Sequence, residues 1–180
     1  YQLDAAARYI FLVNGARHEG YSSITAGGTN AWMGHYFHNS SVLKDGDLVL
    51  MDYAPDYRYY TSDVTRMWPV NGTFAPWQKE LFGYVVKYRD VLLKHIRPGV
   101  TADFVMDEAK KEMTHVWNNT KFSKDIYKKA AEGALTFRGH LSHPVGLTVH
   151  DVGNYRKAPL KAGQVFSVDP MIWIPEESLY

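Results

Sequence analysis

The apolar residues of this chain follow two different periods, and each period is confined to its own part of the sequence. A spacing of three and four residues predicts a long amphipathic helix over 74–96, through Phe74, Trp77, Leu81, Val85, Tyr88, Leu92 and Ile96. The same spacing predicts helices over 4–17, after a cap at Thr101, and over 123–131 with an end at Gly133. Strand character marks 21–26, 47–54, 59–70, 147–150 and 164–168. Because helices and strands come in blocks, we expect an α+β fold with a mostly antiparallel sheet covered by helices.

Composition narrows the class of protein. The 180 residues hold 20 Lys and Arg against 19 Asp and Glu, so the net charge of +1 gives no reason to expect a nucleic-acid partner. Hydrophobic residues make up 46%, which supports one globular domain over 1–180, and no apolar run is long enough for a membrane span. We therefore expect a soluble, cytoplasmic protein. Because the chain has no cysteine, any metal must be held by His, Asp and Glu.

Two aspartates in the predicted hairpin over 47–70 are the first candidates for a metal site. A turn centred between Tyr57 and Arg58 would place Asp52 directly opposite Asp63, with their β-carbons about 4.5–5.5 Å apart. Facing carboxylates among apolar neighbours lose stability unless one is protonated or a cation lies between them, so a bridging divalent metal is one solution. In the other interpretation, one aspartate faces solvent or pairs with Arg58 or Arg66.

A second group of candidate residues is rich in histidine. His140, His143 and His150 fall within eleven residues, and imidazole both binds divalent metals and exchanges protons near neutral pH. An exposed loop with no such role is the alternative, as it is for His35 behind its Gly/Asn loop. Asp169 ends a run of strand character before a proline, where a charge needs a partner or begins a turn.

Four segments in order resemble the motifs of the pita-bread metallopeptidases of family M24, in the branch of Xaa-Pro aminopeptidases and prolidases. They are Asp45-Gly46-Asp47-Leu48-Val49-Leu50-Met51-Asp52, Ser62-Asp63-Val64-Thr65-Arg66, the stretch from Ser142 to Gly153 with its Val149-His150-Asp151, and the stretch from Leu160 to Pro170. The resemblance implies the pita-bread fold. It also implies that Asp52, Asp63 and His143 are metal ligands, with Asp63 bridging two divalent ions. We expect manganese, with cobalt or zinc as alternatives.

The same resemblance assigns roles toward a substrate. Asp169 corresponds to a carboxylate that ligates one ion and helps to handle the proton of the attacking water. His150 and His35 correspond to histidines that orient or stabilise the substrate carbonyl. The implied reaction is hydrolysis of the bond before proline in peptides with proline in second position, by a metal-bound hydroxide. Cleavage of Xaa-Pro dipeptides is an alternative within the family, and a homodimer is left open.

Three departures from the family pattern qualify this prediction. Asp169 stands where the family has Glu, one methylene longer, and Gly139-His140 stands where relatives more often have His-Gly, so His140 receives no role. The family's last Glu ligand has no counterpart, because Glu176 and Glu177 lie in a Pro-led turn. The chain also begins within a predicted helix, so we expect a domain incomplete at both ends. A non-catalytic pita-bread module that binds peptide or protein is the rival hypothesis.

Overall fold

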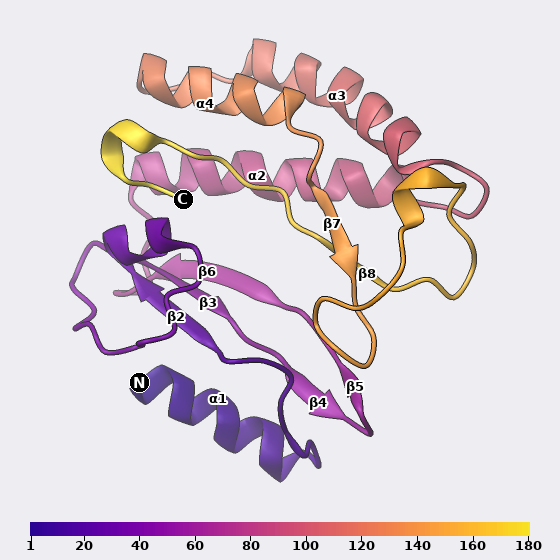
Figure 1. Cartoon of the computed structure of the whole chain (residues 1–180). Coiled ribbons are helices and arrows are strands. Elements are labelled where there is room, and N and C mark those ends of the chain that lie inside the picture. The colour runs from indigo at the N-terminus through magenta and orange to yellow at the C-terminus, as the bar shows by residue number, and fades with distance from the viewer. The chain divides into compact units, whose positions relative to one another are not determined.

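The computed structural model describes the backbone of residues 1–180 and every side chain except that of Lys157. The chain divides into two compact units (Figure 1). Unit 1 comprises residues 1–75, 145–151 and 178–180, and unit 2 comprises residues 76–144 and 152–177. Each unit contains helices and antiparallel strands, as expected for an α+β fold.

Unit 1 is built on two small antiparallel sheets. The first has the order β2-β3-β6, from β2 (Ile24–Gly27), β3 (Leu48–Asp52) and β6 (Thr65–Pro69). The second has the order β1-β4-β5, from β1 (His18–Glu19), β4 (Pro55–Tyr57) and β5 (Tyr60–Thr61). One long hairpin supplies strands to both sheets, because β3 continues toward β4 and β5 continues toward β6. This hairpin carries Asp52 and Asp63.

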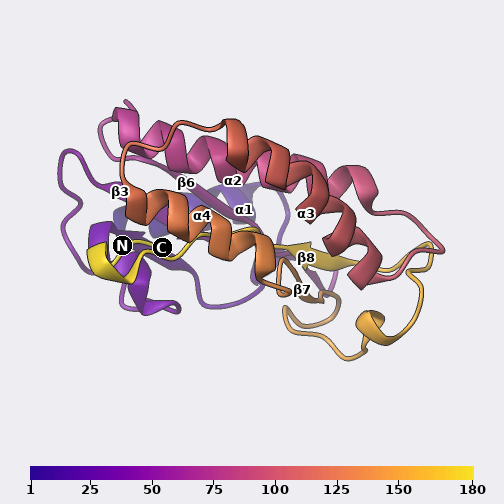
Figure 2. The ribbon, with the colours of Figure 1, turned by 90° about the horizontal axis from the view of Figure 1, so that it is seen from above.

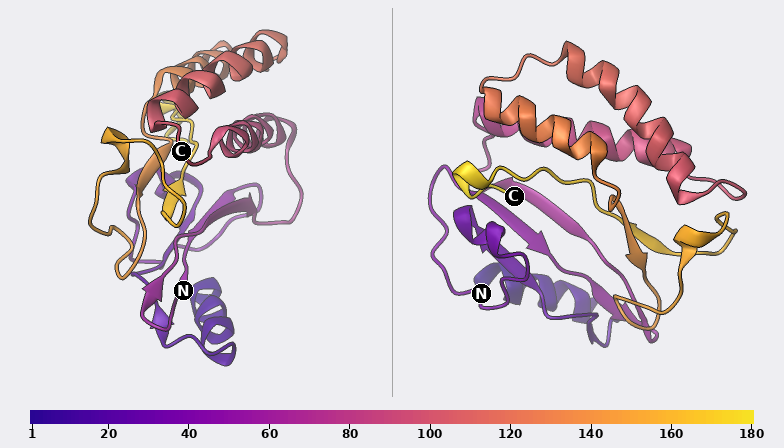
Figure 3. Two further views of the ribbon diagram at one scale, coloured as in Figure 1. Left: turned by 90° about the vertical axis from the view of Figure 1, so that its right-hand side faces the viewer. Right: turned by 45° about the horizontal axis from the view of Figure 1, so that its top comes forward.

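The helices of unit 1 are α1 (Gln2–Val13) and the short 3-10 helix η1 (Gly28–Met33). Helix α1 lies alongside the strands of this unit, as the views of Figure 3 agree, and it contacts β1 and β2. The core of the unit joins β2, β3 and η1 through Ile24, Ala26, Ala31, Tyr36 and Leu50, with Met67 and Tyr180 packed against them. The sheet therefore buries one face against its own loops.

The register of the hairpin differs from the predicted one. Tyr57 pairs with Tyr60, so the two-residue turn is Arg58-Tyr59 and its centre lies one residue later than expected. In the same register, Asp52 pairs with Thr65. Direct opposition of Asp52 and Asp63 was therefore a wrong prediction. Asp63 instead lies in the segment between β5 and β6, two residues before the partner of Asp52.

Unit 2 contains three long helices, which Figure 2 shows from above. They are α2 (Pro76–His95), α3 (Ala102–Asn119) and α4 (Asp125–Thr136), with α3 in contact with both of the others. The Thr101 hydroxyl accepts a hydrogen bond from the Phe104 amide at 3.1 Å, so the predicted cap is confirmed. The predicted end of the third helix at Gly133 was wrong, because α4 continues through this glycine to Thr136.

Tyrosines on α2 join this helix to α4 by hydrogen bonds. The hydroxyls of Tyr84 and Tyr88 donate to the carbonyls of Ala131 and Ala134 on α4, at 3.2 and 3.3 Å. Buried apolar residues from all three helices surround them, including Leu81, Leu92, Val105, Ala109, Met113, Tyr127 and Leu135. The helical period therefore predicted the core-facing side of α2 and α3 correctly at most positions.

The remaining elements of unit 2 are β7 (Leu141–Pro144), η2 (Tyr155–Lys157), β8 (Phe166–Val168) and η3 (Pro175–Glu177). Strands β7 and β8 form an antiparallel pair. The predicted strand over 164–168 is confirmed as β8, whereas the one over 147–150 was wrong: that segment forms bends in unit 1. Among the described residues, no helix is both long enough and apolar enough to cross a membrane.

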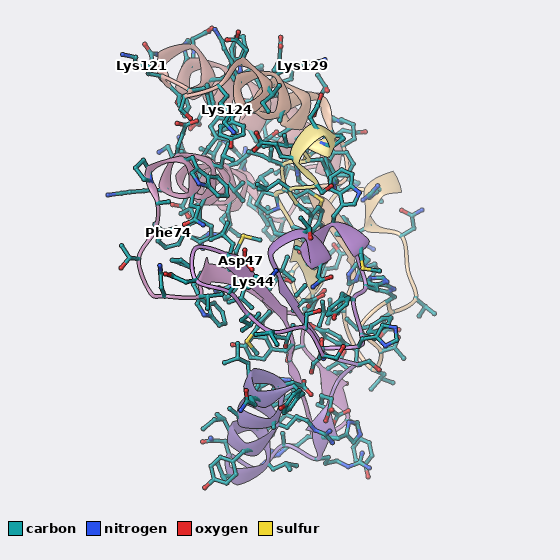
Figure 4. The ribbon with its side chains drawn as sticks, turned by 90° about the vertical axis from the view of Figure 1, so that its left-hand side faces the viewer. Lys44, Asp47, Phe74, Lys121, Lys124 and Lys129 are labelled. Carbon is teal, nitrogen blue, oxygen red and sulfur yellow. The ribbon has the colours of Figure 1, made fainter. Side chains whose placement is uncertain are left out.

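Figure 4 labels three lysines in or just before α4, which are Lys121, Lys124 and Lys129. Lys121 and Lys129 are exposed. Lys124 forms an ion pair with Glu177 and lies over the ring of Tyr127, 4.7 Å from its centroid. At least one of these charges is thus neutralised within the protein.

Candidate metal centre

The carboxylates of Asp52 and Asp63 meet at one phenol in unit 1. Asp52 is the last residue of β3, and Asp63 lies between β5 and β6. The Tyr21 hydroxyl lies 2.5 Å from Oδ1 of Asp52, to which it donates, and 3.2 Å from Oδ1 of Asp63. The structure therefore brings these two predicted ligands together, although their strand register is not the one expected.

Two carboxylates at one hydroxyl need positive charge nearby. Burial and the hydrogen bond to Asp52 raise the pKa of the Tyr21 phenol above its ordinary value. Tyr21 therefore stays protonated and supplies a hydrogen with partial positive charge between two anions. A divalent cation would supply the same attraction more strongly, and carboxylate oxygens are suitable ligands for it. This pair of side chains fits the metal that the motifs imply.

His143 lies in an irregular part of β7 in unit 2. Leu141 pairs with Val168 and Pro144 pairs with Phe166, so Ser142 and His143 together stand opposite the single residue Ser167. This two-against-one arrangement is a β-bulge, a feature that changes the direction of side chains near active sites. A bulge could not be predicted from the His-x-x-Gly spacing, which carries no information on pairing.

The imidazole of His143 has a defined tautomer. Its Nδ1 lies 3.1 Å from the carbonyl oxygen of Pro144, and a carbonyl can only accept, so Nδ1 carries the proton. The other nitrogen, Nε2, is then the one that a metal could bind in the neutral ring. A backbone carbonyl that holds one ring nitrogen in this way is typical of histidines that bind metal through the other. His143 is therefore suited to the ligand role.

Asp169 directly follows β8, and its backbone is attached to the helical core through His140. The Asp169 amide donates to the carbonyl of His140 at 2.7 Å. The ring of His140 is fully buried, packs at 4.6 Å between centroids from Tyr88, and donates from Nε2 to the carbonyl of Ala134 at 2.8 Å. Burial lowers the pKa of His140, so it is a neutral core residue that holds Asp169 in place.

The two histidines that were assigned to the substrate both belong to unit 1. His150 lies in loop 145–151, which is hydrogen-bonded to β5. His35 follows η1 and a glycine with φ of +66°, and its ring stacks on that of Phe37 with 5.5 Å between centroids. Both histidines are exposed. Their roles toward a substrate stay predictions.

The acidic residues near the end of the chain have another use. Both carboxylate oxygens of Glu177 are engaged in unit 2, one by Lys124 and the other by the Tyr127 hydroxyl at 2.7 Å. These partners lower the pKa of Glu177, led by the hydrogen bond from Lys124. The structure thus supports the prediction that Glu177 does not replace the family's last ligand.

Tyr21 is a residue of the candidate site that the motifs did not reveal. It precedes β2, outside all four motif segments, and an isolated tyrosine before a strand is an ordinary feature of sequences. Only the pairing of β2 with β3, in which Ile24 stands opposite Asp52, brings this part of the chain close to the carboxylates. No signal within the local sequence could have identified it.

Comparison with known proteins shows the family of this chain. Residues 1–179 match the metallopeptidase family M24. The Xaa-Pro aminopeptidase of Escherichia coli is 34% identical over 99% of this chain and 42% of its own length. The mouse Xaa-Pro aminopeptidase 3 is also 34% identical, over 87% of this chain and 31% of its own length. The chain therefore spans less than half the length of these relatives.

Solved structures share the fold. Proline aminopeptidase P II from Yersinia pestis superposes with a TM-score of 0.81 at 33% identity, over 99% of this chain and 42% of that chain. Zinc-substituted E. coli aminopeptidase P in complex with product gives a TM-score of 0.79 at 30% identity, over 99% of this chain and 43% of that one. The expected pita-bread fold is thereby confirmed. The chain belongs to the metallopeptidase family M24.

Proposed function

We propose that the protein containing this chain is a metal-dependent Xaa-Pro aminopeptidase, which hydrolyses the bond before a proline in second position. The observation that carries the proposal is the meeting of Asp52 and Asp63 at the Tyr21 hydroxyl, since paired carboxylates of this kind suit a cation. The relatives are named Xaa-Pro aminopeptidases, which favours this activity over cleavage of Xaa-Pro dipeptides. We also propose that units 1 and 2 act as one catalytic domain.

The metal ligands in this proposal are Asp52 and Asp63 from unit 1 and His143 and Asp169 from unit 2. Three carboxylates and one imidazole suit manganese, cobalt and zinc alike, and we favour two manganese ions. A zinc-substituted structure among the relatives shows only that E. coli aminopeptidase P accepts zinc. When bound, such ions make hydroxide accessible at neutral pH and polarise the substrate carbonyl.

The residues of the chain have separate roles in the proposed reaction. Asp169 accepts the proton of the attacking water, and its backbone bond to the His140 carbonyl keeps it at the end of β8. His150 and His35 bind and orient the substrate carbonyl from unit 1. Because Asp169 is shorter than the family's Glu, its carboxyl group has less reach. The non-catalytic binding module is the rival that depends on this difference.

A metal-dependent assay separates the two functions. The protein that contains this chain would be stripped with chelator, loaded with Mn²⁺, Co²⁺ or Zn²⁺, and tested on an Xaa-Pro-Xaa peptide and its Xaa-Ala-Xaa analogue. Asp63→Ala should abolish turnover, whereas Asp90→Asn, at an exposed residue of α2 paired with Arg89, should leave it unchanged. Equal turnover by wild type and Asp63→Ala would reject the mechanism, and metal binding without turnover would favour the binding module.

Two further expectations remain predictions. A homodimer would appear in analytical ultracentrifugation as a species of twice the monomer mass. A cytoplasmic location would appear on cell fractionation as recovery of the protein with cytoplasmic enzymes.

A further inference from the structure

The carbonyl group of Gly146 joins loop 145–151 to the hairpin, and both belong to unit 1. The backbone amide of Thr61 donates to the carbonyl oxygen of Gly146 at 2.8 Å, and the Thr61 hydroxyl donates to the same oxygen at 3.1 Å. Thr61 is the last residue of β5, two positions before Asp63. The loop is therefore attached to the hairpin two residues along the chain from this carboxylate.

The loop is also closed by hydrogen bonds of its own. The Leu147 amide donates to Oδ2 of Asp151 at 2.7 Å, and the Gly146 amide donates to the carbonyl of Thr148 at 3.1 Å. The Thr148 hydroxyl donates to the carbonyl of His150 at 3.1 Å. These bonds fix the backbone on both sides of His150. They also explain why 147–150 does not form the expected strand, since side-chain acceptors compete with strand pairing.

Gly146 is required by this closure. A β-carbon at this position would lie 2.0 Å from Oδ2 of Asp151, which is far inside van der Waals contact. Any larger residue would therefore push away the carboxylate that holds the Leu147 amide. We call the hydrogen-bonded group of Thr61, Gly146, Leu147 and Asp151 the loop latch.

We propose that Thr61 and Asp151 are positioning residues, which act through the loop latch to set where His150 stands relative to Asp63. Thr61 sets the position of the loop along the hairpin, and Asp151 sets the shape of the loop around His150. Neither residue needs to contact substrate. The proposal rests on the proposed function for the role of His150, while the geometry of the latch stands without it.

Kinetics of matched variants test the role in catalysis. In the metal-loaded protein, Thr61→Val should lower kcat roughly 2- to 10-fold and Asp151→Ala roughly 10-fold or more, from loss of a neutral and a charged hydrogen bond. Thr61→Ser and Asp151→Asn keep an equivalent group and should retain activity. The bound metal per protein should be unchanged in all four variants, because none alters a proposed ligand.

A double-mutant cycle shows whether the latch acts through His150. If it does, Thr61→Val should have little further effect on kcat in a protein that already carries His150→Ala. Equal fold losses in both backgrounds would overturn the positioning role, since a general loss of folded protein would reduce activity in either background. Retained activity in Thr61→Val alone would overturn it as well.

Hydrogen exchange measured by mass spectrometry tests the latch even if no Xaa-Pro peptide is cleaved. Peptides covering 145–151 should exchange faster in Asp151→Ala than in wild type, and at the wild-type rate in Asp151→Asn. Absence of turnover by wild type with this exchange pattern would reject the proposed function and retain the latch. Wild-type exchange in Asp151→Ala, with the thermal midpoint unchanged, would overturn the latch itself.

Discussion

Replacing Tyr21 by Phe removes a hydroxyl that lies within hydrogen-bonding distance of both Asp52 and Asp63. The two Oδ1 atoms lie no further apart than 2.5 Å plus 3.2 Å, about 5.7 Å, because each is within hydrogen-bonding distance of the same oxygen. Two unit charges at that separation repel by about 3 kcal/mol at an effective dielectric constant of about 20. A hydrogen bond to a charged group offsets about 1.5–3 kcal/mol. Metal-free Tyr21→Phe should therefore lose about 1.5–3 kcal/mol of unfolding free energy.

Bound metal should reverse much of this loss. A cation neutralises the carboxylates directly, so the variant depends less on the missing hydroxyl once metal is present. Urea unfolding of wild type and Tyr21→Phe, each in chelator and then in excess Mn²⁺, should show the larger metal-induced gain in the variant. Tyr9→Phe, on the exposed part of α1, is the matched control, and it should behave as wild type in both conditions.

Two outcomes would refute this reasoning. If Tyr21→Phe were as stable as wild type in chelator, the hydroxyl would not be holding the carboxylates together. If the variant had a lower free energy of unfolding in chelator and Mn²⁺ stabilised the two proteins equally, the hydroxyl and the metal would not be acting on the same charges.

Two more predictions concern the rest of the fold. Burial raises the pKa of Tyr88 to about 12, so its share of stability is present below the ordinary value of 10 and is lost as pH rises toward 12. The free energy of unfolding, measured with urea between pH 9 and 11.5, should thus fall more steeply with pH for wild type than for Tyr88→Phe. Parallel curves for the two proteins would contradict this. Arg58 and Tyr59 have φ of +53° and +71° in the hairpin turn, so Arg58→Asn should raise the unfolding free energy by about 1 kcal/mol. An unchanged or lower thermal midpoint would count against strain at this turn.

The helices could be predicted because their signals are local. The apolar period identified α2 and α3. The start of α3 is marked by a hydrogen bond between the Thr101 hydroxyl and the amide of Phe104, only three residues later in the sequence. The hairpin turn was placed one residue too early for a related reason. Arg58-Tyr59 holds neither Gly nor Asn, the residues that usually mark two positive φ angles, so no local signal indicated the centre of the turn.

Sequence motifs supplied the candidate ligands, which stay predictions, but not the residues that contact them. Asp52, Asp63, His143 and Asp169 came from motifs, but what holds them comes from contacts between distant segments. Tyr21 reaches the carboxylates from the segment before β2, 31 positions before Asp52. His140 holds Asp169 through a backbone bond that depends on the pairing of β7 with β8. Such contacts depend on strand register and packing, and single-sequence patterns carry little information on either.

The extra residue in β7 limits how this segment can change during evolution. Since Ser142 and His143 share one partner on β8, deleting either would give the ladder even spacing and reduce its local twist. The imidazole would then leave the backbone in another direction, even if the histidine itself survived. Substitutions of Ser142 should accordingly be tolerated among descendants of this gene, while gains or losses of a residue between His140 and Pro144 should be eliminated by selection.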